Sequence, residues 1–303
     1  MLLPISPKPG TQACRGVRGR LAFAASQSVP RGELAHCPSQ KEVLMPEYTT
    51  ILFEVKDHVA HLTLHRPEAA NSLNATVSAE MMDAVIRCEE EEEIRALVIS
   101  GVGRMFCAGA DLKGFSTPHD GLKSHISYFH ATLSRLAQAD LPVIAAVNGA
   151  AAGAGMGLAC ACDLVLAAES ARFIMAYTRI GLSPDGGTTY FLPRRIGIGR
   201  ALELFYTNRT LSAREAVEWG IANRVVPDSE LATEAHALAT QLAAGPTKAF
   251  GAGKRLMHTG WNESLESQIE QELRSIAVMS RTEDAREAIA AFAAKRAPQF
   301  KGQ

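Results

Sequence analysis

Short apolar runs that end at glycine or at a polar turn alternate with helical patterns over residues 48–200. Residues 48–64 contain two alternating runs around Asp57-His58, which predicts a β-hairpin. Further helices and strands are predicted at residues 74–92, 96–100, 122–138 and 142–147. Strands that alternate with helices form right-handed β–α units, so their pairing is at least partly parallel. The pattern therefore predicts an α/β protein.

The pattern becomes helical nearly throughout after Arg200. Ser212 and Thr282 stand at the starts of two of these helices, where a side-chain oxygen can accept a hydrogen bond from a free N–H. We therefore expect a compact α/β core at residues 45–205 and a helical C-terminal subdomain at residues 206–303.

Residues 1–44 have a different composition, with several prolines, four arginines and two acids. An Arg-rich and acid-poor leader is typical of a mitochondrial transit peptide, which would place the protein in the mitochondrial matrix. A disordered tail, or a start codon upstream of the real one at Met45, explains the same composition. We favour these two interpretations and a cytoplasmic location, because regular strand patterns begin soon after Met45.

Composition and charge exclude several classes of function. The chain has 303 residues, of which 47% are hydrophobic, and a formal net charge of −1, so a nucleic-acid partner is not expected. No apolar stretch is long enough to cross a membrane. None of the six cysteines forms a CxxC pair, and no cluster has metal-ligand spacing. We expect buried free thiols, and neither a metal nor a bound cofactor.

Two segments rich in small residues, 103–112 and 148–157, follow predicted buried strands. Missing side chains let a ligand approach the backbone, and the start of a helix supplies N–H groups without internal partners. Two such donors directed at one oxygen form an oxyanion hole. Tight packing between helices explains either segment alone equally well.

At these residues the sequence resembles the crotonase family, also called the enoyl-CoA hydratase/isomerase family. The resemblance covers residues 47–301 and is carried by residues 66–74, 108–112, 142–163, 185–188 and 292–296. It implies a crotonase-like spiral of ββα turns with a C-terminal helical subdomain. It also implies a coenzyme A thioester as substrate and assembly as homotrimers or homohexamers.

The resemblance further implies which residues form the site. The backbone N–H groups of Ala110 and Ala154 would form the oxyanion hole. The coenzyme A moiety would lie along Glu68, Ala70, Ala108, Asp111 and Leu112. Phe292 and Lys295 would reach the ligand of a neighbouring subunit.

Hydratases of this family carry two glutamates, and neither is present here. The corresponding positions are Gly157 and Tyr177. Addition of water normally needs one group to activate the water and another to protonate carbon. Ordinary hydratase activity is therefore not expected.

A single carboxylate, Asp185, follows Pro184 and precedes Gly186-Gly187. By itself this pattern is typical of a turn. It also resembles the isomerases of phenylacetyl-CoA catabolism, whose essential aspartate falls here, and the chlorobenzoyl-CoA dehalogenase, whose nucleophilic aspartate falls at the same place.

His130 stands where that dehalogenase has its general base, although a packed helix histidine explains it as well. Tyr177 replaces the dehalogenase's tryptophan. We expect an enzyme that shifts a double bond with Asp185. The alternatives are a hydrolase that uses Asp185 as nucleophile and His130 as base, and a catalytically weak acyl-CoA-binding protein.

Overall fold

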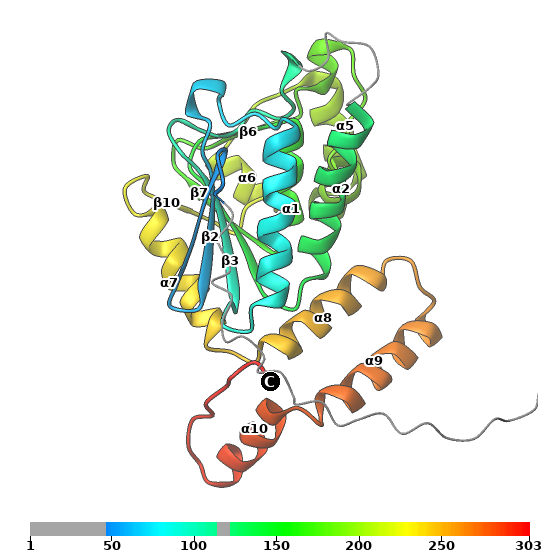
Figure 1. Cartoon of the computed structure of the whole chain (residues 1–303). Coiled ribbons are helices and arrows are strands. Elements are labelled where there is room, and N and C mark those ends of the chain that lie inside the picture. The colour runs from blue at the N-terminus through cyan, green and yellow to red at the C-terminus, as the bar shows by residue number, and fades with distance from the viewer. Residues whose placement is uncertain (1–46, 114–121) are drawn as a thin grey trace, which may run out of the picture. The chain divides into compact units, whose positions relative to one another are not determined.

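The computed structural model describes residues 47–113 and 122–303, all of which belong to one compact unit, Pro46–Gln303 (Figure 1). Residues 1–44, which we expected to be a leader, lie outside the described residues, as do residues 114–121.

The larger sheet has six strands in the order β1-β2-β3-β5-β7-β10. The strands are β1 (Ile51–Lys56), β2 (Val59–Leu64), β3 (Ala96–Gly101), β5 (Val143–Val147), β7 (Leu164–Ala168) and β10 (Arg224–Val226). The antiparallel pair β1–β2 is the predicted hairpin, and Asp57 and His58 turn it with positive φ angles. All other pairs in this sheet are parallel, so the expected α/β class is confirmed.

A second sheet has the order β4-β6-β8-β9. Its strands are β4 (Met105–Cys107), β6 (Ala150–Ala152), β8 (Arg172–Ile174) and β9 (Leu211–Ser212). Three successive turns of the chain, which begin at β3, β5 and β7, each give one strand to each sheet and then a helix. The expected ββα spiral is confirmed. We did not predict β4 and β6, because each has only three residues and lies within a small-residue segment.

Helices cover both faces of the larger sheet. α1 (Ala75–Glu90), α2 (Leu122–Gln138) and α3 (Ala154–Ala161) lie on one face, and α7 (Leu231–Ala243) lies on the other (Figure 1). Along β3, Leu97 and Ile99 join the core cluster beneath α1, while Val98 joins the cluster beneath α7. Alternate residues of a strand point to opposite faces. The continuous apolar run at 96–99 is therefore explained by burial on both faces.

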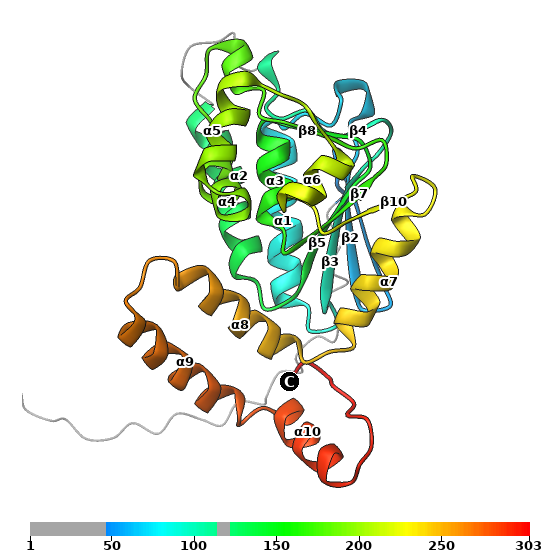
Figure 2. The ribbon, with the colours of Figure 1, turned by 180° about the vertical axis from the view of Figure 1, so that it is seen from behind.

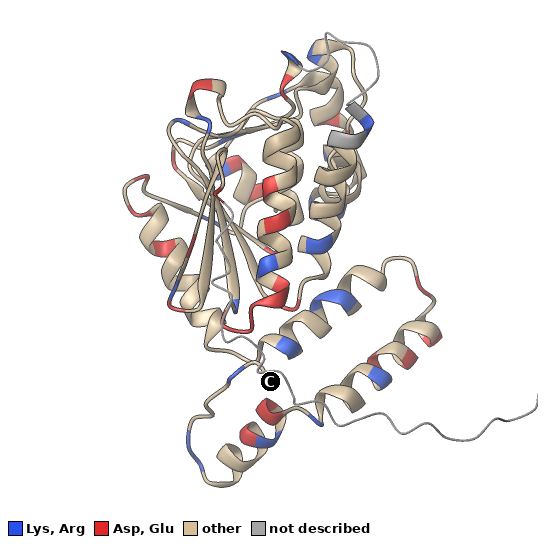
Figure 3. Ribbon diagram, viewed as in Figure 1, with Lys and Arg blue, Asp and Glu red and all other residues tan. Residues whose placement is uncertain are grey.

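The acidic run at residues 89–93 forms the C-terminal end of α1 and the loop after it (Figure 3). Glu91 pairs with Arg87 on the same helix, and Glu89 pairs with Arg135 of α2. The run thus forms one ion pair at the end of α1 and one between α1 and α2.

The remaining α-helices lie within the spiral or after it. They are α4 (Thr188–Ile196), α5 (Ile198–Thr207), α6 (Ala213–Trp219), α8 (Thr247–Thr259), α9 (Leu265–Met279) and α10 (Glu283–Ala293). Ser212 forms a capping box with Glu215, and Thr282 accepts a hydrogen bond from the N–H of Ala285, so both predicted N-caps are confirmed. Among the described residues, no helix is long and apolar enough to span a membrane.

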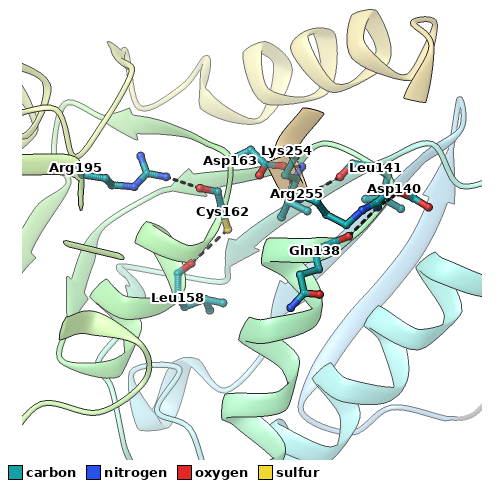
Figure 4. Close-up of polar contacts among 10 residues, drawn as sticks. Gln138, Asp140, Leu141, Leu158, Cys162, Asp163, Arg195, Lys254 and Arg255 are labelled. Carbon is teal, nitrogen blue, oxygen red and sulfur yellow. Dashed lines mark hydrogen bonds and ion pairs between the residues drawn. The ribbon is translucent and has the colours of Figure 1, made fainter. Parts of the chain in front are cut away.

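The helical region begins later in the chain than residue 206. β10 pairs with β7 and α7 packs on β3 and β5, so the chain up to Ala243 completes the sheet layers. Only α8, α9 and α10 extend from them. Lys254 of α8 anchors this region, donating to Asp163 Oδ2 at 2.9 Å and to the carbonyl of Leu141 at 3.3 Å (Figure 4).

Four cysteines in the described part of the chain are buried free thiols, as expected: Cys88, Cys107, Cys160 and Cys162. Burial raises the pKa of Cys88 and Cys107 to about 12. These thiols are core side chains and are unsuited to act as nucleophiles at neutral pH.

Candidate functional site

The first small-residue segment pairs with the chain that precedes α1. Leu73 donates from its N–H to the carbonyl of Gly109 at 2.8 Å and accepts from the N–H of Asp111 at 2.8 Å. In such a bridge the intervening N–H, that of Ala110, points away from Leu73. It has no acceptor within residues 47–113 and 122–303.

The second segment provides another free donor beside it. α3 begins at Ala154, after Gly153 with φ 53°, and the Ala154 N–H lies in the first turn with no acceptor in the described chain. A Cβ at Gly109 would lie 3.3 Å from Ala154 N and 2.8 Å from Ala152 O. The two segments therefore touch through backbone, and Gly109, with φ 93°, is required for this contact.

The loop that carries Asp185 lies against Ala154. A Cβ at Gly186 would lie 3.3 Å from both Cα and Cβ of Ala154. The Tyr177 hydroxyl donates to Asp185 Oδ1 at 2.9 Å, and Tyr177 is buried next to Gly153. Burial and the charge of Asp185 raise the pKa of Tyr177 far above its ordinary value, so its hydroxyl stays protonated and remains a donor. Asp185 itself is only partly buried.

Gly157, where hydratases carry one glutamate, has no space for a side chain. A Cβ there would lie 2.3 Å from the carbonyl oxygen of Gly186 and 2.7 Å from Thr188 Oγ1. These contacts arise because α3 and α4 lie side by side (Figure 2). The backbone around Asp185 thus occupies the position of the missing acid.

His130, on α2, contacts the same loop. Its Nε2 accepts a hydrogen bond of 3.1 Å from the N–H of Gly186. A ring nitrogen that accepts is unprotonated, so this contact requires the neutral tautomer with the proton on Nδ1. His130 lies outside the buried stripe of α2, which includes Phe129, Leu133 and Leu136.

The five residues expected along coenzyme A lie on one short stretch of surface. Ala108 donates from its N–H to the carbonyl of Ala70 at 3.1 Å, Glu68 is exposed in η1 (Pro67–Ala69), and Leu112 is 49% exposed. The Asp111 carboxylate pairs with Arg66 at 3.1 Å. The ion pair with Arg66 and the hydrogen bond from the Asp111 N–H to the carbonyl of Leu73 therefore connect residues 66–73 to residues 108–112.

Phe292 and Lys295 are not brought to Asp185 within one chain. Both are exposed, Phe292 by 87%, and they lie at or just after the end of α10, at the opposite end of the fold from β6 (Figure 1).

Sequence reasoning assigned no role to Thr188 or Arg66. Thr188 Oγ1 donates to the carbonyl of Asp185 at 2.8 Å, and Arg66 holds the Asp111 carboxylate. Both stand inside the motifs that carry the family resemblance, but only the folded structure shows what they contact.

Comparisons with known proteins identify the family of the chain. Residues 54–303 match the model of the family described as enoyl-CoA hydratase/isomerase. A probable enoyl-CoA hydratase of Rhodobacter capsulatus is 40% identical over 84% of this chain and 99% of its own length. A 1,2-epoxyphenylacetyl-CoA isomerase of Escherichia coli is 40% identical over 84% of this chain and 98% of its own.

A 4-chlorobenzoyl coenzyme A dehalogenase of Arthrobacter is 37% identical over 75% of this chain and 84% of its own. The crystal structure of an enoyl-CoA hydratase from Bacillus anthracis has 35% sequence identity, covers 84% of this chain and all of its own, and superposes with a TM-score of 0.80. The chain belongs to the enoyl-CoA hydratase/isomerase family. The family resemblance and the crotonase-like fold are therefore both confirmed.

Proposed function

We propose that this protein is an acyl-CoA isomerase that moves a double bond along the acyl chain with one carboxylate, Asp185. The observation that carries the proposal is that the loop of Asp185 packs against Ala154, one of two adjacent residues with free backbone N–H groups, while Gly157 and Tyr177 stand at both glutamate positions of a hydratase.

In the proposed mechanism the thioester oxygen accepts hydrogen bonds from the N–H groups of Ala110 and Ala154. Fixed donors stabilise the negative charge that develops on this oxygen, typically by a few kcal/mol for each donor. A proton on the acyl chain is thereby acidified. Asp185 removes this proton and returns it to another carbon, and one group suffices because the two transfers occur in sequence.

The packing at Gly157 argues against a hydratase. Addition of water calls for a second acid–base group, and the space for it is filled by Gly186 and Thr188. Tyr177 does not replace it, because its raised pKa makes it a poor proton donor to carbon and its proton is already held by Asp185.

A hydrolase that uses Asp185 as nucleophile and His130 as base is the main alternative, and the dehalogenase relative makes it worth testing. The contact of His130 argues against it. The lone pair on Nε2 is engaged by the Gly186 N–H, so it is not free to activate water unless this bond breaks.

We also propose that coenzyme A lies along Glu68, Ala70, Ala108, Asp111 and Leu112. In a homotrimer or homohexamer, the partner's α10 would bring a second Phe292 and Lys295 to this ligand. α9 supports assembly, because it exposes an apolar stripe at helical spacing. The stripe consists of Leu265, Ile269, Leu273 and Ile276, each at least 53% exposed. Exposed apolar stripes of this kind commonly mark protein–protein contacts.

Isotope labelling separates the candidate reactions. The purified protein is incubated with trans-2-enoyl-CoA, 3-enoyl-CoA or an aryl-CoA in ²H₂O, and separately in H₂¹⁸O. An isomerase exchanges acyl-chain protons with solvent and incorporates no solvent oxygen. A hydrolase that passes through an aspartyl ester leaves ¹⁸O on Asp185 after several turnovers, which would refute the proposal. Tight acyl-CoA binding with neither result would indicate a binding protein.

A further inference from the structure

The backbone carbonyl of Asp185 accepts two hydrogen bonds from a single residue, Thr188. It accepts from the Thr188 N–H at 3.0 Å and from Thr188 Oγ1 at 2.8 Å. A carbonyl oxygen has two lone pairs, so both acceptor positions are occupied. Thr188 is fully buried at the first position of α4, where no water competes for these contacts.

This arrangement affects the proton of Tyr177. The Tyr177 hydroxyl lies within reach of three oxygens, at 2.9 Å from Asp185 Oδ1, 3.1 Å from Asp185 O and 3.2 Å from Thr188 Oγ1. It has one proton to donate. Since Thr188 saturates the carbonyl and donates its own proton there, the Tyr177 proton is left for the carboxylate.

We infer that Thr188 is a positioning residue, which keeps the Tyr177 proton on Asp185 Oδ1 and fixes the peptide that carries this carboxylate. The inference rests on the proposed role of Asp185. The same hydroxyl lies against position 157, where a Cβ would stand 2.7 Å from Thr188 Oγ1.

The first test follows the Tyr177 proton itself and needs no turnover. The chain has five tyrosines, so labelling with [¹³Cζ]tyrosine gives few NMR signals, and Tyr177→Phe identifies the relevant one. We expect Thr188→Val to move the Tyr177 signal, and Thr188→Ser to leave it within the linewidth. Thr132→Val is the matched control, since Thr132 is also fully buried and its hydroxyl donates to a backbone carbonyl, that of Tyr128.

The second test is kinetic. Thr188→Val should lower kcat about tenfold with KM changed less than threefold, and Thr188→Ser should retain kcat within about threefold. If valine prevents folding, Thr188→Cys keeps the size with a weaker donor and should give an intermediate change in both measurements.

A Tyr177 signal that is unchanged in Thr188→Val but moves in Asp185→Asn would overturn the inference, whatever reaction the protein catalyses. Equal kcat values for the valine and serine variants would overturn it too. Absence of isomerase activity in the wild type would instead count against the proposed function, and the NMR result would still decide the role of Thr188.

Discussion

The Tyr177 hydroxyl donates a hydrogen bond of 2.9 Å to Oδ1 of Asp185 from a buried position beside Gly153. Because burial and the charge of Asp185 raise the pKa of Tyr177 strongly, its hydroxyl remains a donor at neutral pH. One carboxylate oxygen is thus held by the protein, and in the proposed mechanism the other meets the acyl chain.

Tyr177→Phe removes this bond and little volume. We expect kcat to fall about tenfold, which corresponds to the free energy of one hydrogen bond to a charged group. Acyl-CoA affinity should change less than threefold. Steady-state kinetics and a binding titration measure the two effects. Tyr190→Phe, which removes an exposed hydroxyl elsewhere, is the control. Unchanged kcat in Tyr177→Phe would mean that this bond does not position Asp185.

Gly157→Ala should destabilise the protein, because the added Cβ meets backbone oxygen at 2.3 Å. Overpacking of this kind usually costs about 1–3 kcal/mol, and we expect a clear drop in the thermal unfolding midpoint. Gly199→Ala is the matched control, since its Cβ would meet nothing within 4 Å and alanine favours helix α5. Equal midpoints for the two variants would refute the packing argument at position 157.

His130→Gln distinguishes a positioning role from a catalytic base. If His130 only accepts a hydrogen bond from the Gly186 N–H, kcat should fall by about tenfold or less. A tenfold loss corresponds to about 1.4 kcal/mol of activation free energy. If it activates water against an aspartyl ester, the loss should be about 10²–10⁴-fold. A loss above a hundredfold together with accumulation of the ester would contradict the isomerase assignment.

A chain that begins at Met45 should keep the thermal stability and the oligomer size of the full chain. Residues 1–44 carry no pattern of a strand or helix that would join the core. Calorimetry and light scattering measure both properties. A lower unfolding temperature or a smaller assembly would show that the leader contributes to the fold.

Much of the fold was predictable, because long amphipathic segments such as α1 and α2 and fully apolar runs such as β3 carry their own periodic signal. The three-residue strand β10 was missed, since Arg224-Val225-Val226 is too short to show a period. α4 was missed as well, because Gly186-Gly187 and Pro193 suggest loops; the helix begins directly after the two glycines.

The candidate site was predictable only in part. Asp185, Ala110 and Ala154 were identified through family motifs, and the structure brings their segments together. The contact of Thr188 with Gly157 was not predictable, because it depends on how closely α3 packs against α4. A periodic pattern shows which face of a helix is buried, but not how close that face lies to a neighbouring helix.

Asp185→Asn tests the central claim most directly. Asparagine keeps the shape and lets Tyr177 donate to its oxygen, but it cannot take up a proton from carbon. We expect turnover of enoyl-CoA and exchange of its acyl protons with ²H₂O to disappear, while acyl-CoA affinity stays within a few-fold of the wild type. Turnover and exchange at the wild-type rate in this variant would contradict the account and leave Asp185 as a residue of the turn.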